Sequence, residues 1–393
     1  MAIFVASQVF APYQPALTVA PETWALALKY VGNGHEFDGP GAMAFDEHGD
    51  VWVTNNYIFR SNHSVPTCGS DMLLKLTATG ADAPGAPYRG KQGDLDGAGF
   101  GITLDPNGNV WVGNFGFFGS TCPPNLIPPA NSVSKFNPDG MVLSPRTGFT
   151  QGCISSPQGT VSDQQDNIWI ANACGSTITR YHAGNPNDSW VFDIGTGQLA
   201  DPGSSPSFSG AKPFDIAINA DGNAWVSNNT DNTLFKLSPN GTLIVTANSP
   251  ETGIKAPLGV AVDGLGTVWI SNSGIIEIPC ATQSEAQDYG DLAPDLDQAS
   301  VTELNSDGNP VGTQPYKGGG IVIPWGIAVD GNDNIWVATF GGERVTELCD
   351  AKPENYPPGY QTGQPIAPNG YYSDALVRNT GGVHRSIGQC LGN

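Results

Sequence analysis

Asparagine recurs three residues after tryptophan along most of this chain, a spacing that could serve ligand chemistry. A sixth copy of the spacing has Thr339 after Trp336 instead. Amides donate and accept hydrogen bonds but do not titrate, so these positions suit a neutral ligand and cannot supply a general acid or base. The five asparagines are Asn55, Asn114, Asn172, Asn228 and Asn272.

A second recurring position opens each copy of the same pattern and is varied and largely aromatic. It lies one residue after a proline, or after a glycine in the second copy. Aromatic rings stack on sugars and other small neutral molecules, and unlike residues around one site give selectivity. The position holds Gly41, Phe100, Gln158, Phe214, Leu258 and Trp325. Four of these, Phe100, Gln158, Phe214 and Trp325, join the asparagines as candidate ligand-binding residues.

Asp215 interrupts the next position, which is glycine or alanine in the other five copies (Ala42, Gly101, Gly159, Gly259 and Gly326). A carboxylate there would serve as an axial general base, or as a ligand of Ca²⁺ or Mg²⁺. The structural alternative is that it caps neighbouring backbone amides. Both interpretations stay open at this level, and no other cofactor is predicted.

Histidines and long insertions are the remaining candidates for chemistry. The histidines at 35, 48, 182 and 384 are expected in solvated loops, so only His63 remains a catalytic candidate, because it falls in an insertion. Three insertions, Tyr57–Asp71, Phe115–Asn131 and Ser273–Ala299, are long enough to roof a site. The last has alternating carboxylates but lacks the glycine and glutamate positions of an EF-hand loop.

Six copies of one pattern must position all these residues. Each copy has an alternating apolar run ending at Asp or Asn, a Gly/Asn-rich turn, a second run containing Trp, and a third run such as Leu73–Leu76. Hairpins with a third and a weaker fourth strand make four-stranded antiparallel units, and repetition of such units predicts a β-propeller. The six recurring tryptophans, Trp52, Trp111, Trp169, Trp225, Trp269 and Trp336, are then predicted to be buried between blades. We predict a six-bladed, all-β propeller with almost no helix.

The pattern Pro257-Leu-Gly-Val-Ala-Val-Asp263, followed by Trp269-Ile-Ser-Asn272, resembles NHL repeats and, more loosely, virginiamycin B lyase-like propellers. Those enzymes carry a catalytic His in the slot after Pro and a catalytic or metal-holding Glu in the slot after Trp. The matching positions here hold Asn and mostly apolar residues, so the resemblance does not support that lyase activity. It implies an extracellular or periplasmic location, although residues 1–8 lack the basic and apolar regions of a secretory signal.

The repeats divide the chain into three parts. Residues 38–350 are expected to form six blades, and residues 1–37 an N-terminal segment that could supply a closing strand. Residues 351–393 look like a truncated or frame-shifted further repeat, because codon degeneracy allows His384–Leu391 to encode the missing turn-and-Trp motif one nucleotide later. An unrelated tail is the alternative.

Charge and cysteine content narrow the partners. The chain has 16 basic and 37 acidic residues in 393, a formal charge of −21, which disfavours nucleic acid and anionic membranes. Seven cysteines leave at least one unpaired, and we predict the pairs Cys68–Cys122 and Cys153–Cys174 if the protein is exported.

These observations favour a monomer that binds a small neutral or sugar-like molecule at an axial funnel. The alternative is a hydrolase or lyase acting on an ester, lactone or glycosidic bond with Asp215 as acid or base. A scaffold without a small-molecule site is the third possibility, which the long insertions disfavour.

Overall fold

The structure is a computed structural model, and its described residues form antiparallel sheets without any α-helix. One 3₁₀ turn, η2 (His182–Gly184), interrupts the strands. The all-β prediction is confirmed. The described residues are 40–48, 50–55, 57–58, 68–69, 72–77, 81–89, 95, 98–115, 131–194, 199–200, 210–248, 250–274, 299–312, 315–317, 321, 323–329, 335–339 and 344–348.

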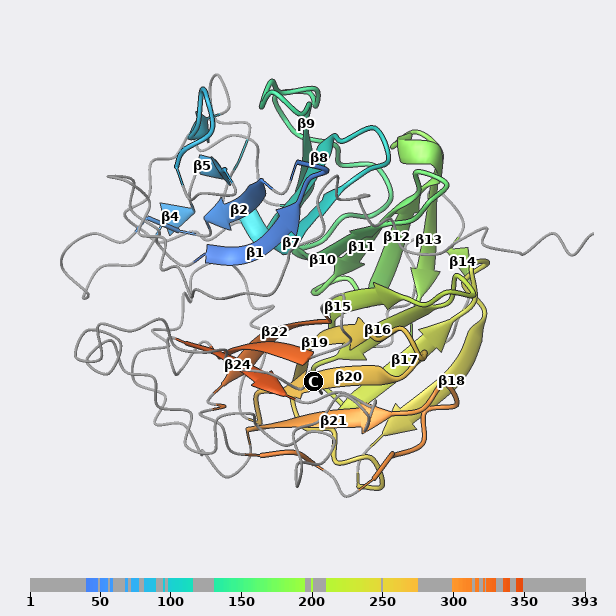
Figure 1. Ribbon diagram of the computed structural model, residues 1–393. Helices are drawn as coiled ribbons and strands as arrows, with labels where there is room; N and C mark the ends of the chain where they lie inside the picture. The colour runs from blue at the N-terminus through green and yellow to red at the C-terminus, as the bar shows by residue number, and fades with distance from the viewer. Residues whose placement is uncertain are drawn as a thin grey trace, which may run out of the picture.

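Each copy of the pattern forms one sheet, in which strands adjacent in sequence are neighbours (Figure 1). The first two sheets are β1 (Pro40–Phe45), β2 (Val51–Asn55), β5 (Met72–Leu76) and β6 (Tyr88–Arg89), and β7 (Ala98–Leu104), β8 (Val110–Asn114) and β9 (Ser132–Phe136). The third is β10 (Pro157–Ser162), β11 (Ile168–Asn172), β12 (Thr177–Tyr181), β13 (Ser189–Asp193) and β14 (Leu199–Ala200). The fourth is β15 (Pro213–Ile218), β16 (Ala224–Asn228), β17 (Thr233–Leu237) and β18 (Leu243–Asn248). The last two are β19 (Pro257–Val262), β20 (Val268–Asn272) and β21 (Ser300–Leu304), and β22 (Pro324–Val329), β23 (Ile335–Thr339) and β24 (Arg344–Leu348).

The insertion after β2 adds a separate two-stranded ladder. Its strands are β3 (Tyr57–Ile58) and β4 (Cys68–Gly69), which pair antiparallel. Most of the other two insertions lies outside the described residues.

A register shift marks the start of every first strand. In β15, Pro213 lies opposite Asn228, but the next pair in register is Ile216 with Val226. The same irregularity occurs in the first strand of each of the other five sheets. Such irregularities change the direction of side chains. The varied position after Pro and the position of Asp215 both lie where the regular strand pairing does not fix the direction of the side chain.

The turn between the first and second strands is held by the aspartate that ends the first run. Asp105 Oδ1 accepts the backbone N–H groups of Asn107 and Asn109, and its Oδ2 accepts the indole N–H of Trp111 at 3.0 Å. Asp163 and Asp263 make the same contacts to Trp169 and Trp269. One side chain therefore closes the turn and satisfies a buried indole N–H group.

The first and fourth sheets lack this last bond. In the first sheet Asp46 Oδ2 pairs with Lys75 at 2.9 Å, and the buried Nε1 of Trp52 has no hydrogen-bond partner in the described structure. Asn219 accepts the N–H groups of Asp221 and Asn223 through Oδ1, as the aspartates do. Its remaining amide group is a donor, and the buried Nε1 of Trp225 has no hydrogen-bond partner in the described structure. A buried unsatisfied donor costs about 1–3 kcal/mol.

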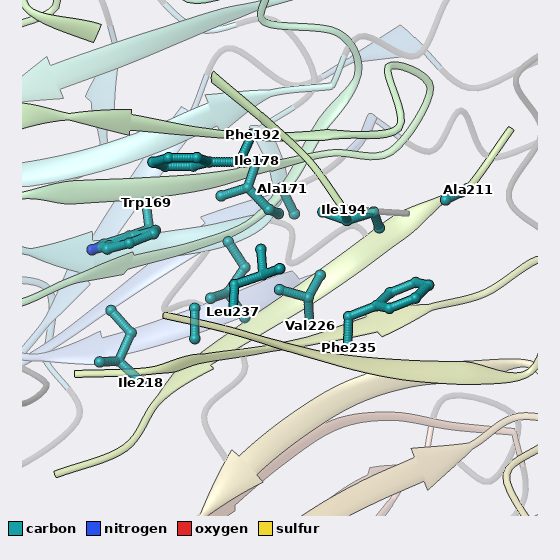
Figure 2. Close-up of a cluster of buried hydrophobic side chains, with 12 residues drawn as sticks. Trp169, Ala171, Ile178, Phe192, Ile194, Ala211, Ile218, Val226, Phe235 and Leu237 are labelled. Atoms are coloured by element: carbon teal, nitrogen blue, oxygen red, sulfur yellow. The ribbon is translucent and has the colours of Figure 1, made fainter. Parts of the chain in front are cut away.

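The sheets are joined by buried clusters in which the Trp of one sheet packs on the strands of the next. Figure 2 shows one such cluster, where Trp169, Ile178 and Phe192 of the third sheet meet Ile218, Val226 and Phe235 of the fourth. Neighbouring first strands also contact each other from β1 through β7, β10, β15 and β19 to β22. Five of the six predicted tryptophans are fully buried, whereas Trp336 is partly exposed.

Replacing Asn219 with Asp should stabilise the protein by about 1–2 kcal/mol, because a carboxylate can accept the Trp225 indole N–H. Lys236, whose Nζ lies 5.0 Å from the Trp225 ring centroid, would neutralise the new charge, as Lys135 neutralises Asp105 at 3.2 Å. Urea unfolding at pH 7 measures the change. Asn305→Asp is the control, because Asn305 Oδ1 caps a similar turn by accepting the N–H groups of Asp307 and Asn309. Equal effects of the two substitutions would contradict this account.

Candidate functional site

Three residues of the varied position after Pro meet in one apolar cluster. Phe214, Leu258 and Trp325 come from the first strands of the fourth, fifth and sixth sheets and are all buried. The rings of Phe214 and Trp325 pack edge to face, with centroids 5.6 Å apart. Ala173, Ile323, Phe115 and Cys174 complete this group, which we call the axial cluster. Equivalent positions of successive sheets therefore converge, as the repeat predicts.

The other candidates of this position and the insertions are only partly described. Gln158 is buried at the start of β10. The backbones of Phe100 and Asn55 belong to β7 and β2, but their side chains, like all of His63, lie outside the described residues.

The asparagines after Trp form hydrogen bonds within their own sheets. The amide nitrogen of Asn172 donates to Thr177 Oγ1 at 3.1 Å and to Thr179 Oγ1 at 2.8 Å, while its oxygen accepts the backbone N–H of Ser155. Asn114, Asn228 and Asn272 donate in the same way to Ser or Thr hydroxyls of the third strand. All four are fully buried. These amides, expected to face a ligand, bond instead to the third strand, and those of Asn172, Asn228 and Asn272 also tie the segment before the sheet to it.

Asp215 bridges two neighbouring first strands. Its Oδ2 accepts the backbone N–H of Val260 in β19 at 3.1 Å, and its Oδ1 accepts the N–H of Ile216. The backbone N–H of Asp215 donates to Ser227 Oγ, which in turn donates to the Leu258 carbonyl. The expected alternative of capping backbone amides is therefore realised, and any catalytic or cation-binding role would have to compete with these bonds.

Burial raises the pKa of Asp215 to about 6, although the hydrogen bonds from Val260 and Ile216 lower it. Asp215 is half-buried and therefore not fully enclosed. A raised carboxyl pKa is a property of acid–base catalysts that buried structural carboxylates share.

One further carboxyl group with a raised pKa was not among the residues predicted from the sequence. Burial, Asp105 and Asp163 raise the pKa of Asp166 to about 6. Asp166 stands in the turn between β10 and β11 at φ 63°, where the corresponding turns have glycines such as Gly108 and Gly222. In the sequence, Asp166 could have been singled out because it replaces the glycine of the corresponding turns. It lies at the opposite end of the sheet from the axial cluster.

The described histidines and cysteines add no catalytic group to the axial cluster. His48 and His182 are exposed at the opposite ends of their sheets, where they pair with Glu47 and Asp188. The predicted Cys153–Cys174 disulfide is wrong: Cys153 is a free, exposed thiol in a turn at φ 57°, whereas Cys174 packs on the axial cluster and is bonded to another cysteine. The side chains of Cys68 and Cys122 lie outside the described residues.

Within the described part of the chain, no group of three or more His, Cys, Asp or Glu side chains is placed to hold a metal ion. The acidic stretch Asp288, Asp291, Asp295 and Asp297 lies outside it. No helix in that part has the length and apolar character needed to cross a membrane.

The fold is that of a β-propeller. Virginiamycin B lyase from Staphylococcus aureus superposes with a TM-score of 0.52 at 14% identity, covering 82% of this chain and 84% of that one. A streptogramin B lyase gives a TM-score of 0.51 at 16% identity, covering 81% and 82%. At such identities the likeness concerns the fold alone. No family model and no curated protein matches the sequence.

Substituting Asp215 with Asn should change how stability depends on pH. The folded-state pKa is raised, so the wild-type carboxyl contributes its stability below about pH 4 and loses it as pH rises through about 6. The Asn variant lacks this loss, so its stability relative to wild type should rise between pH 4 and pH 7 by about 1–3 kcal/mol. Urea unfolding at both pH values tests this, with exposed Asp188→Asn as control. A difference independent of pH would contradict the assignment.

Proposed function

We propose that the six sheets are NHL-type blades around one axis and that the protein binds a small neutral or sugar-like molecule at the end where the first strands begin. The observation that supports this most is the axial cluster, in which unlike residues of successive sheets converge. Phe214 and Trp325 supply aromatic rings of the kind that stack on sugars and apolar rings. Both rings are buried in the axial cluster, so ligand binding requires the cluster to open. Buried Gln158 supplies an amide at the equivalent place in the third sheet.

The proposed selectivity comes from the irregular positions. Asn114, Asn172, Asn228 and Asn272 use their amide hydrogens inside the sheets, so the repeated amides hold the framework. The position after Pro differs from sheet to sheet and lies in an irregular part of the ladder. It can therefore vary without loss of the strands. We propose a monomer that acts outside the cell, without nucleic-acid or membrane partners.

Ligand-induced stabilisation tests the proposal, because a ligand that binds only the native state raises the melting temperature. Monosaccharides, aldonolactones and aryl esters are screened, each with and without Ca²⁺ or Mg²⁺. For the class that stabilises wild type, Trp325→Phe should weaken binding about tenfold, the loss expected for one good contact. Trp190→Phe, on an outer strand and 37% exposed, is the matched control. Equal losses in both variants, or stabilisation by no class, would refute the proposal.

A second candidate function is hydrolysis or elimination with Asp215 as the acid or base. The observation that favours it is the pKa of about 6, which leaves both protonation states accessible near neutral pH. The carboxylate accepts the backbone N–H groups of Ile216 and Val260, so proton transfer would require release from at least one of them.

If a lactone or ester is turned over, Asp215→Asn should reduce kcat at least about 100-fold, because a positioned acid or base contributes about that much. The pH–rate profile of wild type should have a limb near pH 6 that Asp188→Asn retains. Turnover that survives in Asp215→Asn with the same limb would assign the chemistry to another group.

A further inference from the structure

The contacts between sheets follow one rule along the chain. The Trp of each sheet packs against the first two strands of the sheet that follows. Trp52 clusters with Ile102 and Leu104, and Trp225 with Val260 and Ile270. Trp269 in turn clusters with Ile335 and Val337 of the last sheet. An aromatic residue of the preceding sheet thereby packs on the first strands β7, β15, β19 and β22, and in the third sheet Trp111 packs on the second strand, β11.

The first sheet departs from this rule on one face. Met43 and Phe45 of β1 are 61% and 50% exposed. Their equivalents in β7, Ile102 and Leu104, are 7% and 5% exposed, and those in β15 are similarly buried. The described residues include no sheet before β1. Two large apolar side chains thus stand where every later sheet receives an aromatic partner.

The N-terminal sequence contains two segments that match the Trp strand and the third strand of the described sheets. Ile3-Phe4-Val5-Ala6-Ser7 matches the Trp strand of the sixth sheet, Ile335-Trp336-Val337-Ala338-Thr339. Leu26-Ala27-Leu28-Lys29-Tyr30 matches the third strand of the first, Met72-Leu73-Leu74-Lys75-Leu76. In the first two sheets the Trp precedes the Lys of the third strand by 23 and 24 residues, and Phe4 precedes Lys29 by 25.

We propose that residues 3–7 and 26–30 form the second and third strands of an additional sheet, which packs the ring of Phe4 on Met43 and Phe45 of β1. Phe4 occupies the place of the recurring Trp. We assign this segment of the same chain to the exposed face because its sequence carries the same strand pair and directly precedes β1, as each Trp strand precedes the sheet that it covers.

Cross-strand pairing supports this register. Trp52 lies opposite Lys75, and Trp111 opposite Lys135, with the ammonium groups 4.9 and 4.3 Å from the ring centroids. The proposed register pairs Phe4 with Lys29, an aromatic residue with a lysine as in the first two sheets. The nine residues 31–39 span up to about 30 Å, which is enough to return from a third strand across two strand spacings of about 4.8 Å to β1.

Photo-crosslinking identifies what covers the face. Phe45 is replaced by p-benzoylphenylalanine in the full chain, and Leu265, an apolar residue 58% exposed on a turn of the fifth sheet, is replaced likewise as control. An equal mixture of ¹⁴N- and ¹⁵N-labelled chains is irradiated and digested. The expected product joins residue 45 to a peptide from residues 1–30 of the same chain, and the control gives no such peptide.

Other products would overturn the proposal, each with a defined meaning. A link to residues 335–348 means direct closure of six sheets, and a link to residues 351–393 means closure by the C-terminal part. Mixed-isotope products mean a second copy. No product at all means that the face is open.

Substitutions at Phe4 provide an independent measurement. Phe4→Asp should lower the melting temperature by about 5 °C or more, as expected for loss of a buried aromatic contact in a chain of this size. Phe4→Trp restores the residue of the other sheets and should leave the melting temperature unchanged or raised. Leu265→Asp should have no effect. An unchanged melting temperature in Phe4→Asp overturns the proposal.

Discussion

The buried tryptophan of each second strand is the contact on which the architecture depends. At Trp111 this contact has three parts. The indole N–H donates to Asp105, the ring lies under the ammonium group of Lys135, and the side chain packs against the third sheet. Turn, strand pairing and sheet packing are thus coupled through one side chain. Loss of one component is tolerated, since the fourth sheet keeps its place although Trp225 lacks the indole bond. This tolerance follows because the packing of a buried aromatic residue outweighs one neutral hydrogen bond.

Close approach of neighbouring first strands imposes the second constraint. A Cβ on Gly259 would lie 2.6 Å from the Trp325 carbonyl oxygen, and one on Gly101 would clash with the Gln158 carbonyl. Glycine at this position therefore lets adjacent sheets touch through their backbones. Ala42 and Asp215 depart from glycine at this position, and the Asp215 carboxylate reaches the neighbouring first strand by accepting the Val260 N–H. The same substitution brings a titratable group into the interior, which explains its raised pKa.

Strands, turns and buried tryptophans could be predicted from sequence because they depend on period and on turn residues, which recur six times. The convergence of Phe214, Leu258 and Trp325 followed from repetition as well. The role of the asparagines did not, because an amide binds a ligand and a hydroxyl equally well. The Ser and Thr pairs of the third strands, such as Thr177 and Thr179, were the overlooked signal. The disulfide of Cys174 was missed because nearness along the chain does not determine which way two side chains point.

Framework and specificity are therefore carried by different residues of the same short motif. Proline, asparagine, aspartate and tryptophan recur because each makes contacts that every sheet requires, and their hydrogen-bonding groups are largely used within the fold. The residue after proline makes no such contact in common, so its identity can differ between sheets. In a repeat protein whose recurring polar groups are already paired, the chemistry available to a ligand comes from the positions that break the pattern. The positions that break the pattern here are Gln158, Phe214, Asp215 and Trp325, which three different sheets contribute at the end where their first strands begin.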